Sequence, residues 1–398
     1  MKSLRELYRI GKGPSSSHTM GPATAAALFR KDTPTATKYR VELYGSLAAT
    51  GRGHMTDRAV VSELGANRTE VVWKPEVVPS FHPNGLRIFA YDGTGAELLK
   101  RDYYSIGGGA VSVEGRSVEG AEIYPFKAMG EILKSCSDKG QPIWSIVEDC
   151  EDADIWNYLG TVLETMDAAI VRGLEADGAL PGGLRLSRRA RSTYLKAALQ
   201  ASEIKRTGLL VAYAQAVAEE NAALGEIVTA PTCGSCGVVP AVLRYMKETH
   251  GCSRTELLRA LAVAGVFGNV VKTNGSISGA EVGCQGEIGV ACAMASAAAS
   301  YLLGGSTRQC ETAAEIGLEH FLGLTCDPVM GLVQVPCIER NAIAATRALV
   351  AGEMSILSDG HHMVSFDTVV KTMVETGHDL PSLYRETSTG GLSAFVGR

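Results

Sequence analysis

Three cysteines in the second half of the chain have the spacing and surroundings expected of a set of metal ligands. Cys284 opens a run of small residues, VGCQGEIGVACAMASAAAS, and Cys326 and Cys337 follow after 42 and a further 11 positions. The segment between the last two is interrupted by proline and glycine, and such a loop can turn two thiolates toward one point. Three converging thiolates suit an iron–sulfur cluster, which usually takes four cysteines. With three, one iron keeps an open position for a substrate oxygen.

A simpler interpretation is that these cysteines are small core residues, because cysteine is among the most buried residue types. The sequences around them favour the metal. VGCQGEIGVACAMA and CDPVMGLVQVPCIERNA resemble the catalytic domain of the iron–sulfur L-serine dehydratases. The resemblance covers nearly the whole chain and implies a 4Fe–4S cluster that binds the substrate hydroxyl. The cluster ligands that it implies are Cys284, Cys326 and Cys337.

A second candidate segment, GPSSSHTMGPATAAALF, lies near the N-terminus. Its glycines and prolines predict a loop, and Pro22 suits the first turn of a following helix. Hydroxyls and N–H groups ahead of a helix form an anion site that a carboxylate can fill, although an ordinary Ser/Thr-rich helix entry is the alternative. GPSSSHTMGP matches the serine dehydratase signature. The substrate-binding residues that this match implies are Ser15, Ser16, Ser17 and Thr19.

Two histidines are candidates for the base of an elimination reaction, because histidine titrates near neutrality. His18 lies in the hydroxyl-rich segment, and His54 lies in GRGHMTDRAVVSELG. A single histidine on a glycine-rich loop is more often a bystander. This segment, however, resembles the family's GKGHGTD, with Met55 in place of a glycine. The resemblance implies that His54 reaches the active site from the smaller domain, and we rank the two histidines as equal candidates.

Further donors for a carboxylate lie in KTNGSISGAEVG, directly before Cys284. This segment resembles the family's KANASISGAEVGCQ, with Gly275 in place of an alanine. Side-chain hydrogen bonds to the substrate are expected from Lys272, Asn274 and Ser276, and Arg340 is expected to act as an outer cation.

Cys233 and Cys236 form a CxxC in IVTAPTCGSCGVVPAVL. Such a pair can be a redox couple or half of a zinc site, but a zinc site needs two more ligands at a recognisable spacing. The segment resembles the family's active-site loop APTxGxCG, in which the first cysteine is not general. We expect Cys233 to form part of a pocket wall and Cys236 to be buried, with neither binding iron.

The chain divides by pattern into a strand-rich part and a helical part. YRVELY, TEVVWK, LRIFAY and AVSVEG predict an α+β domain over residues 1–124 with a small mixed or antiparallel sheet. From Tyr124-Pro125 onward the pattern predicts an all-α catalytic domain over residues 125–398. A short helix is also expected over Met1–Ile10. The helices predicted in the second domain are Ile155–Arg172, Leu195–Leu224, Thr255–Val271, Ile288–Leu303, Cys310–Gly323, Ile338–Leu357 and Phe366–Thr376.

Composition makes several classes of partner improbable. The net charge is −5 and 20% of residues are charged, without a basic stripe, so we expect neither nucleic acid nor an acidic membrane as a partner. The longest uncharged run, residues 288–307, consists mostly of Ala, Gly and Ser and is too weakly apolar to span a bilayer. The N-terminal residues do not form a signal peptide pattern. A cytoplasmic location is therefore expected.

The resemblance implies β-elimination of L-serine to pyruvate and ammonia, with the substrate hydroxyl on the open iron and a histidine removing the Cα proton. It implies an oxygen-sensitive enzyme of amino-acid degradation and gluconeogenesis that needs no pyridoxal phosphate. We also expect a homodimer. Two alternatives stay open: an L-cysteine desulfidase, in which thiolate leaves, and an iron–sulfur redox sensor or binding protein.

The end of the chain differs from part of the family. Some relatives finish with a cysteine that occupies the open iron position at rest. No cysteine follows Cys337 here, and the sequence ends in Gly397-Arg398. We therefore expect water or hydroxide at that position in the absence of substrate.

Overall fold

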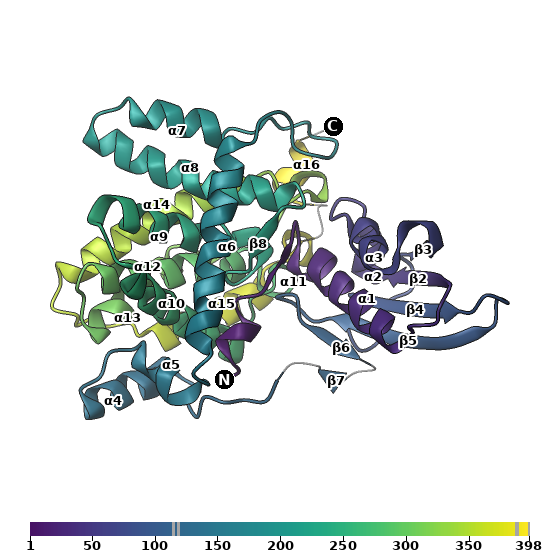
Figure 1. The fold of residues 1–398 in the computed structure, drawn as a ribbon. Coiled ribbons are helices and arrows are strands. Elements are labelled where there is room, and N and C mark those ends of the chain that lie inside the picture. The colour runs from purple at the N-terminus through teal and green to yellow at the C-terminus, as the bar shows by residue number, and fades with distance from the viewer. Residues whose placement is uncertain (114–115, 118–119, 387–389, 397–398) are drawn as a thin grey trace. The chain divides into compact units, whose positions relative to one another are not determined.

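A computed structural model describes residues 1–113, 116–117, 120–386 and 390–396 (Figure 1). The chain forms two compact units, Lys12–Glu119 and a larger one that joins Met1–Gly11 to Gly120–Arg398. The predicted fold class, an α+β domain and an all-α domain, is confirmed. The predicted boundary between residues 124 and 125 stays a prediction. Gly397-Arg398, which carry the expectation about the fourth iron position, lie outside the described residues.

The smaller unit is built on a mixed sheet in the order β3-β2-β4-β5-β6-β7. Strands β2 and β3 are parallel, as a strand–helix–strand connection requires, and the other pairs are antiparallel. The strands are β2 Lys38–Tyr44, β3 Thr69–Lys74, β4 Gly85–Tyr91, β5 Glu97–Ser105, β6 Val111–Val113 and β7 Arg116–Ser117. The helices are α1 Gly21–Asp32, α2 Gly45–Ala49 and α3 Thr56–Leu64.

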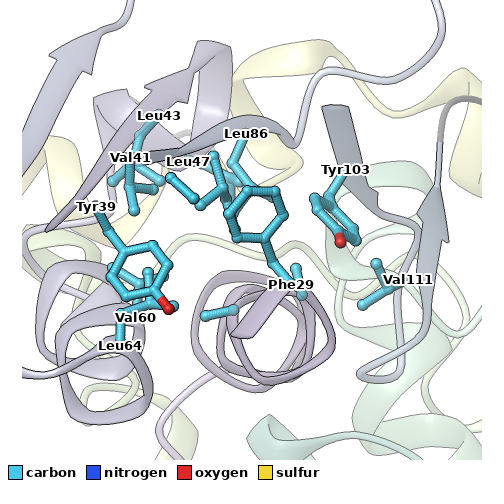
Figure 2. Close-up of a cluster of buried hydrophobic side chains, with 14 of the residues drawn as sticks. Phe29, Tyr39, Val41, Leu43, Leu47, Val60, Leu64, Leu86, Tyr103 and Val111 are labelled. Carbon is cyan, nitrogen blue, oxygen red and sulfur yellow. The ribbon is translucent and has the colours of Figure 1, made fainter. Parts of the chain in front are cut away.

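Alternation along the strands creates the core of this unit. In β2 and β4 every second side chain faces α1 and α3, so that Val41, Leu43, Leu86 and Ile88 are fully buried. Phe29 of α1 lies at the centre of this cluster (Figure 2), with its ring 6.3 Å from those of Tyr39 and Tyr103. The core therefore fixes α1, and with it the segment that enters α1.

Three of the predicted strands are confirmed, and the errors have physical causes. YRVELY, TEVVWK and LRIFAY coincide with β2, β3 and β4, whereas only three residues of AVSVEG form β6. Strand β5 was missed because ELLKRDYYS is largely polar and its outer half is exposed. The helix predicted over Met1–Ile10 is wrong. A single 3₁₀ turn, Leu4–Glu6, is followed by strand β1, Ile10–Lys12, which pairs with β8, Glu226–Val228.

The larger unit is helical around α12, which contacts α9, α10, α13 and α14. Small residues let these helices approach closely: a Cβ on Gly317 of α13 would lie 3.1 Å from the Cα of Ala293 in α12. Its helices are α4 Met129–Lys139, α5 Ser145–Cys150, α6 Ile155–Glu175, α7 Ala190–Ala198, α8 Ser202–Ala222, α9 Val238–His250, α10 Arg254–Asn274, α11 Gly279–Val282, α12 Val290–Leu302, α13 Thr307–Glu319, α14 Cys337–Ile356, α15 Phe366–Asp379 and α16 Leu392–Phe395.

Most predicted helices are present, with one clear error. The helix expected over Leu195–Leu224 is interrupted, because α7 ends at Ala198 and α8 begins at Ser202. Helix α9 was missed, since glycines and a proline obscure its first turn. None of the helices in the described ranges is both long enough and apolar enough to cross a membrane.

Candidate active site

The larger unit brings two of the predicted cluster ligands together around a half-buried carboxylate. The thiols of Cys284 and Cys326 and a carboxylate oxygen of Glu287 all lie within 4.8 Å of one another. Cys284 precedes the π-helical turn Gln285–Gly289 that leads into α12. The third predicted ligand, Cys337, is the first residue of α14 and is close enough to Cys284 for the two to interact electrostatically.

Main-chain hydrogen bonds hold the first two cysteines in place. The N–H of Cys284 donates to the carbonyl of Leu324 at 3.0 Å, and the N–H of Cys326 donates to that of Tyr384 at 2.8 Å. The carbonyl of Cys326 in turn accepts from the N–H of Glu386 at 2.8 Å. The cysteines therefore sit on backbone that the surrounding loops fix, as a preorganised ligand set requires.

The three thiols differ in their readiness to ionise. A hydrogen bond from Cys326 and the nearby guanidinium of Arg340 lower the pKa of Cys284. The same hydrogen bond, together with burial, raises the pKa of Cys326, while burial and Cys284 raise that of Cys337. Three buried thiolates are stable together only beside additional positive charge. All ten cysteines are free thiols, and these three have the donor chemistry of an iron–sulfur ligand set.

Glu287 is the residue at this site that the sequence analysis missed. Thr232 donates to its carboxylate at 2.7 Å, and burial raises the pKa of the group. Two glycines make room for it: a Cβ on Gly234 would lie 3.2 Å from one carboxylate oxygen, and a Cβ on Gly279 would lie 2.9 Å from the other. Its position could have indicated a role at the site, because Glu287 lies one helical turn after Cys284 in the segment VGCQGEIGVACAMA that resembles the serine dehydratases.

Arg340 is fixed from two sides. It donates to the carbonyl of Thr325 at 2.6 Å and to the carboxylate of Asp327 at 3.1 Å. Cys284 also interacts with it and contributes to a raised arginine pKa. The predicted outer cation is therefore close to the cysteines, where its charge stabilises a thiolate.

The other predicted donors of the larger unit make local contacts. Lys272 donates to the carbonyl of Glu6 at 2.9 Å, and Asn274 donates to that of Lys127. The hydroxyl of Ser276 accepts from the N–H of Ser278 at 3.1 Å. These contacts position the chain before α11, and the role of the three side chains in substrate binding stays a prediction.

In the smaller unit the hydroxyl-rich segment forms a π-helical turn, Ser16–Met20, that continues directly into α1. Ser15 caps this turn by accepting from the N–H of His18 at 3.1 Å. The hydroxyl of Thr19 donates to the carbonyl of His54 at 2.7 Å. The structure thus joins the two predicted segments within one unit, with Pro22 in the first turn of α1 as expected.

The two candidate bases lie side by side, with their ring centroids 4.6 Å apart. Both nitrogens of His18 are engaged, one with Ser17 at 2.9 Å and the other with Ser46 at 3.0 Å. In contrast, neither ring nitrogen of His54 has a hydrogen-bond partner among the described residues. Burial lowers the pKa of His54 to about 4, and burial and the adjacent His54 lower that of His18. Both rings are therefore neutral at pH 7.

The CxxC is fully buried beside the carboxylate. Cys233 begins the 3₁₀ turn Cys233–Ser235 and Cys236 directly follows it, and burial raises the pKa of both thiols. Glu287 contributes to the shift at Cys233. The expected burial of Cys236 is confirmed, and the expectation that neither cysteine binds iron stays a prediction.

Comparison with known proteins agrees with the resemblance seen in the sequence. The family model "Serine dehydratase alpha chain" matches residues 46–393, and "Serine dehydratase beta chain" matches residues 3–72. The chain is 42% identical to the L-serine dehydratase of Streptomyces coelicolor, over 99% of each chain. It is 41% identical to L-serine dehydratase 1 of Escherichia coli, over 100% of this chain and 99% of the relative. For the L-serine dehydratase of Helicobacter pylori the identity is 36%, over 98% of each chain. The chain therefore belongs to the serine dehydratase family.

Proposed function

We propose that this chain converts L-serine to pyruvate and ammonia with a 4Fe–4S cluster held by Cys284, Cys326 and Cys337. The observation that carries the proposal is the meeting of Cys284 and Cys326 beside Arg340 and Glu287, in a chain similar to L-serine dehydratases over its whole length. When bound, the cluster supplies a Lewis-acidic iron that takes up negative charge as the hydroxyl leaves.

The chain's own residues hold the two charged groups of the substrate. Arg340 and the hydroxyls of Ser15, Ser16, Ser17 and Thr19 are proposed to bind the carboxylate, as predicted from the sequence. Glu287 is proposed to pair with the ammonium group. A carboxylate whose pKa is raised by burial recovers its charge beside a cation, so this pairing suits its environment.

His54 is proposed as the base, because it offers a lone pair that no other described residue uses. It takes the Cα proton while the C–O bond breaks, and this proton and the departing hydroxide together make one water. The product, 2-aminoacrylate, tautomerises to an imine, and hydrolysis of the imine consumes a water and gives pyruvate and ammonia. His18, hydrogen-bonded on both nitrogens, is proposed to hold the geometry beside it.

Iron and sulfide counts on anaerobically purified protein test the ligand set. Cys284→Ala, Cys326→Ala and Cys337→Ala are each expected to lose the cluster and its broad absorption near roughly 400 nm. Cys310→Ala is the matched control, because it removes a buried thiol from α13. Cys233→Ala and Cys236→Ser are expected to retain iron near the wild-type level. Loss of iron in Cys236→Ser would show that the ligand set is wrong.

Turnover with different amino acids tests the reaction. Anaerobic protein is expected to form pyruvate from L-serine faster than it releases hydrogen sulfide from L-cysteine. Faster sulfide release would favour a desulfidase, and a stable cluster without turnover of either substrate would favour a sensor or binding protein.

A further inference from the structure

Gln285 is a fully buried residue whose side-chain amide makes four hydrogen bonds. Its oxygen accepts from the N–H of Gly323 at 3.0 Å and from the hydroxyl of Thr376 at 3.1 Å. Its nitrogen donates to the carbonyl of Val282 at 2.8 Å and to that of Met373 at 3.2 Å. An amide has two N–H donors and two acceptor lone pairs, so each of them has a partner. Because a main-chain N–H can only donate and a carbonyl can only accept, these partners also fix which way the amide points.

Three parts of the larger unit meet at this side chain. Helix α11 supplies one of the two carbonyl acceptors, and α15 supplies the other acceptor and the hydroxyl donor. Gly323 lies in the loop that leads from α13 to Cys326. Gln285 itself begins the π-helical turn that leads into α12. The amide therefore joins the start of this turn to α11, to α15 and to the loop that carries Cys326.

The contact with the loop lies beside a main-chain contact between the same two segments. The N–H of Cys284 donates to the carbonyl of Leu324 at 3.0 Å, and the Gln285 oxygen binds the residue before Leu324. Gly283 permits this close approach, since a Cβ there would lie 2.6 Å from the carbonyl oxygen of Leu324. Cys326 follows Leu324 by two positions. The two adjacent hydrogen bonds thus determine how closely the segments of the two cysteines approach.

We propose that Gln285 is a positioning residue that holds Cys284 and Cys326 at the spacing that metal binding requires. The inference rests on the proposed function only in naming the metal as a 4Fe–4S cluster. An amide suits this place because it makes four hydrogen bonds without charge, whereas a carboxylate would add to the negative charge of the thiolates. Replacement of a residue that orients metal ligands typically weakens metal binding about 10- to 100-fold.

Cadmium binding to the metal-free, full-length protein tests this role without iron. Thiolates bind soft metal ions, and the thiolate-to-cadmium charge-transfer absorption reports the contact. The part of the signal that is lost in Cys284→Ala belongs to this site. Gln285→Met keeps the approximate shape of the side chain and removes its four hydrogen bonds. Cd²⁺ is therefore expected to bind the site about tenfold or more weakly in Gln285→Met.

Asn269→Leu is the matched control, because it also replaces a buried amide of the larger unit by an apolar side chain of similar shape. Asn269 lies in α10 and donates to the carbonyl of Lys2 at 2.6 Å. Both variants are expected to lower the urea denaturation midpoint, since each leaves buried groups without a partner. Only Gln285→Met is expected to weaken Cd²⁺ binding. Equal weakening in the two variants, or unchanged affinity in Gln285→Met, would overturn the proposal.

A pair of threonine variants on α15 keeps the test decisive if Gln285→Met does not fold. The hydroxyls of Thr372 and Thr376 donate to the carbonyl four positions earlier, at 3.0 Å and 2.8 Å, and that of Thr376 also lies 3.1 Å from the Gln285 oxygen. Thr376→Val is therefore expected to weaken Cd²⁺ binding about threefold, and Thr372→Val is expected to leave it unchanged. Equal affinities in these two variants would overturn the proposal.

Anaerobic reconstitution with iron and sulfide separates this role from the proposed function. Gln285→Met is expected to retain less iron than either the wild type or Asn269→Leu. A wild type that binds no iron, but binds Cd²⁺ at Cys284 more tightly than Gln285→Met does, would reject the cluster and support the role of Gln285. An iron-loaded wild type with the same Cd²⁺ affinity as Gln285→Met would support the cluster and reject the role of Gln285.

Discussion

Two neighbouring histidines that differ in their side-chain hydrogen bonding give the first residue-scale prediction. His54 has no hydrogen-bond partner for either ring nitrogen among the described residues, whereas His18 is held by Ser17 and Ser46. His54→Gln is therefore expected to lower kcat by about 10² to 10⁴ with the cluster retained. Exchange of the substrate Cα proton with deuterated water should stop in His54→Gln and persist in Ser46→Ala. Exchange that survives in His54→Gln would assign the base elsewhere.

The pH profile gives a second prediction from the same residue. Burial lowers the pKa of His54 to about 4, and a base must be neutral to accept a proton. Activity should therefore be complete at pH 6.5, where an ordinary histidine would be half protonated, and should fall only as the pH drops toward 4. The measurement is kcat/KM against pH, with circular dichroism to verify folding. An acidic limb centred near 6.5 would contradict the assignment.

Gly279 gives a third prediction, because it lies against both Cys326 and Glu287. A Cβ at this position would lie 3.0 Å from the sulfur of Cys326 and 2.9 Å from the Glu287 carboxylate. Gly279→Ala is therefore expected to displace a ligand and lower the iron content after anaerobic reconstitution. Gly93→Ala is the control, since a Cβ there would meet nothing within 4 Å. Unchanged iron content in Gly279→Ala would show that the site accommodates the methyl group.

At the scale of elements, strands and helices with a clear local sequence pattern were predicted, and those that depend on tertiary contacts were missed. Strands β2 to β4 are rich in β-branched and aromatic residues and were found, whereas β5 is held in the sheet by β4 and β6 despite its polar sequence. The thiols were recognised from the sequences around them. Glu287 was not, because a glutamate on a helical turn is normally solvent-exposed, and only the fold shows that it lies half-buried between Thr232 and Gly279.

The crossing of α6 and α8 allows an element-scale prediction. A Cβ on Gly173 of α6 would lie 2.2 Å from the carbonyl oxygen of Ala216 in α8, and a backbone atom cannot rotate away. Gly173→Ala should therefore lower the free energy of unfolding by about 1 to 3 kcal/mol. In Gly130→Ala on α4, a Cβ would lie 3.5 Å from its nearest neighbour, so little loss is expected. Urea denaturation of the two variants compares them, and equal midpoints would contradict the prediction.

At the scale of the whole molecule, the chain enters the larger unit twice. Met1–Gly11 belongs to that unit although 108 residues, Lys12–Glu119, form the other. Leu4, Leu7 and Tyr8 are fully buried there, and the hydroxyl of Tyr8 donates to the carbonyl of Leu261 at 2.9 Å. The sequence pattern could not show that this segment packs in the larger unit, because a short segment of this composition is as compatible with a separate helix as with a buried turn and strand.

Glu151 ties this N-terminal segment to the rest of the larger unit. Its side chain is 1% exposed and accepts from the hydroxyl of Ser3 and the N–H of Leu4, both at 2.7 Å, and from Tyr124 at 2.9 Å. Glu151→Ala would leave these buried donors without an acceptor, so a loss of about 2 to 3 kcal/mol in unfolding free energy is expected. Limited proteolysis should then cut within residues 1–11 first.

The neighbouring Asp152 provides the control for this last prediction. It is exposed and binds Arg5 of the same segment at 2.8 Å and 3.0 Å. Because exposed ion pairs contribute little, Asp152→Ala should keep a near-wild-type denaturation midpoint and proteolysis pattern. If the two variants instead lose stability equally, surface charge rather than the buried carboxylate holds the segment. If neither loses stability, the segment is held by Leu4, Leu7 and Tyr8 alone.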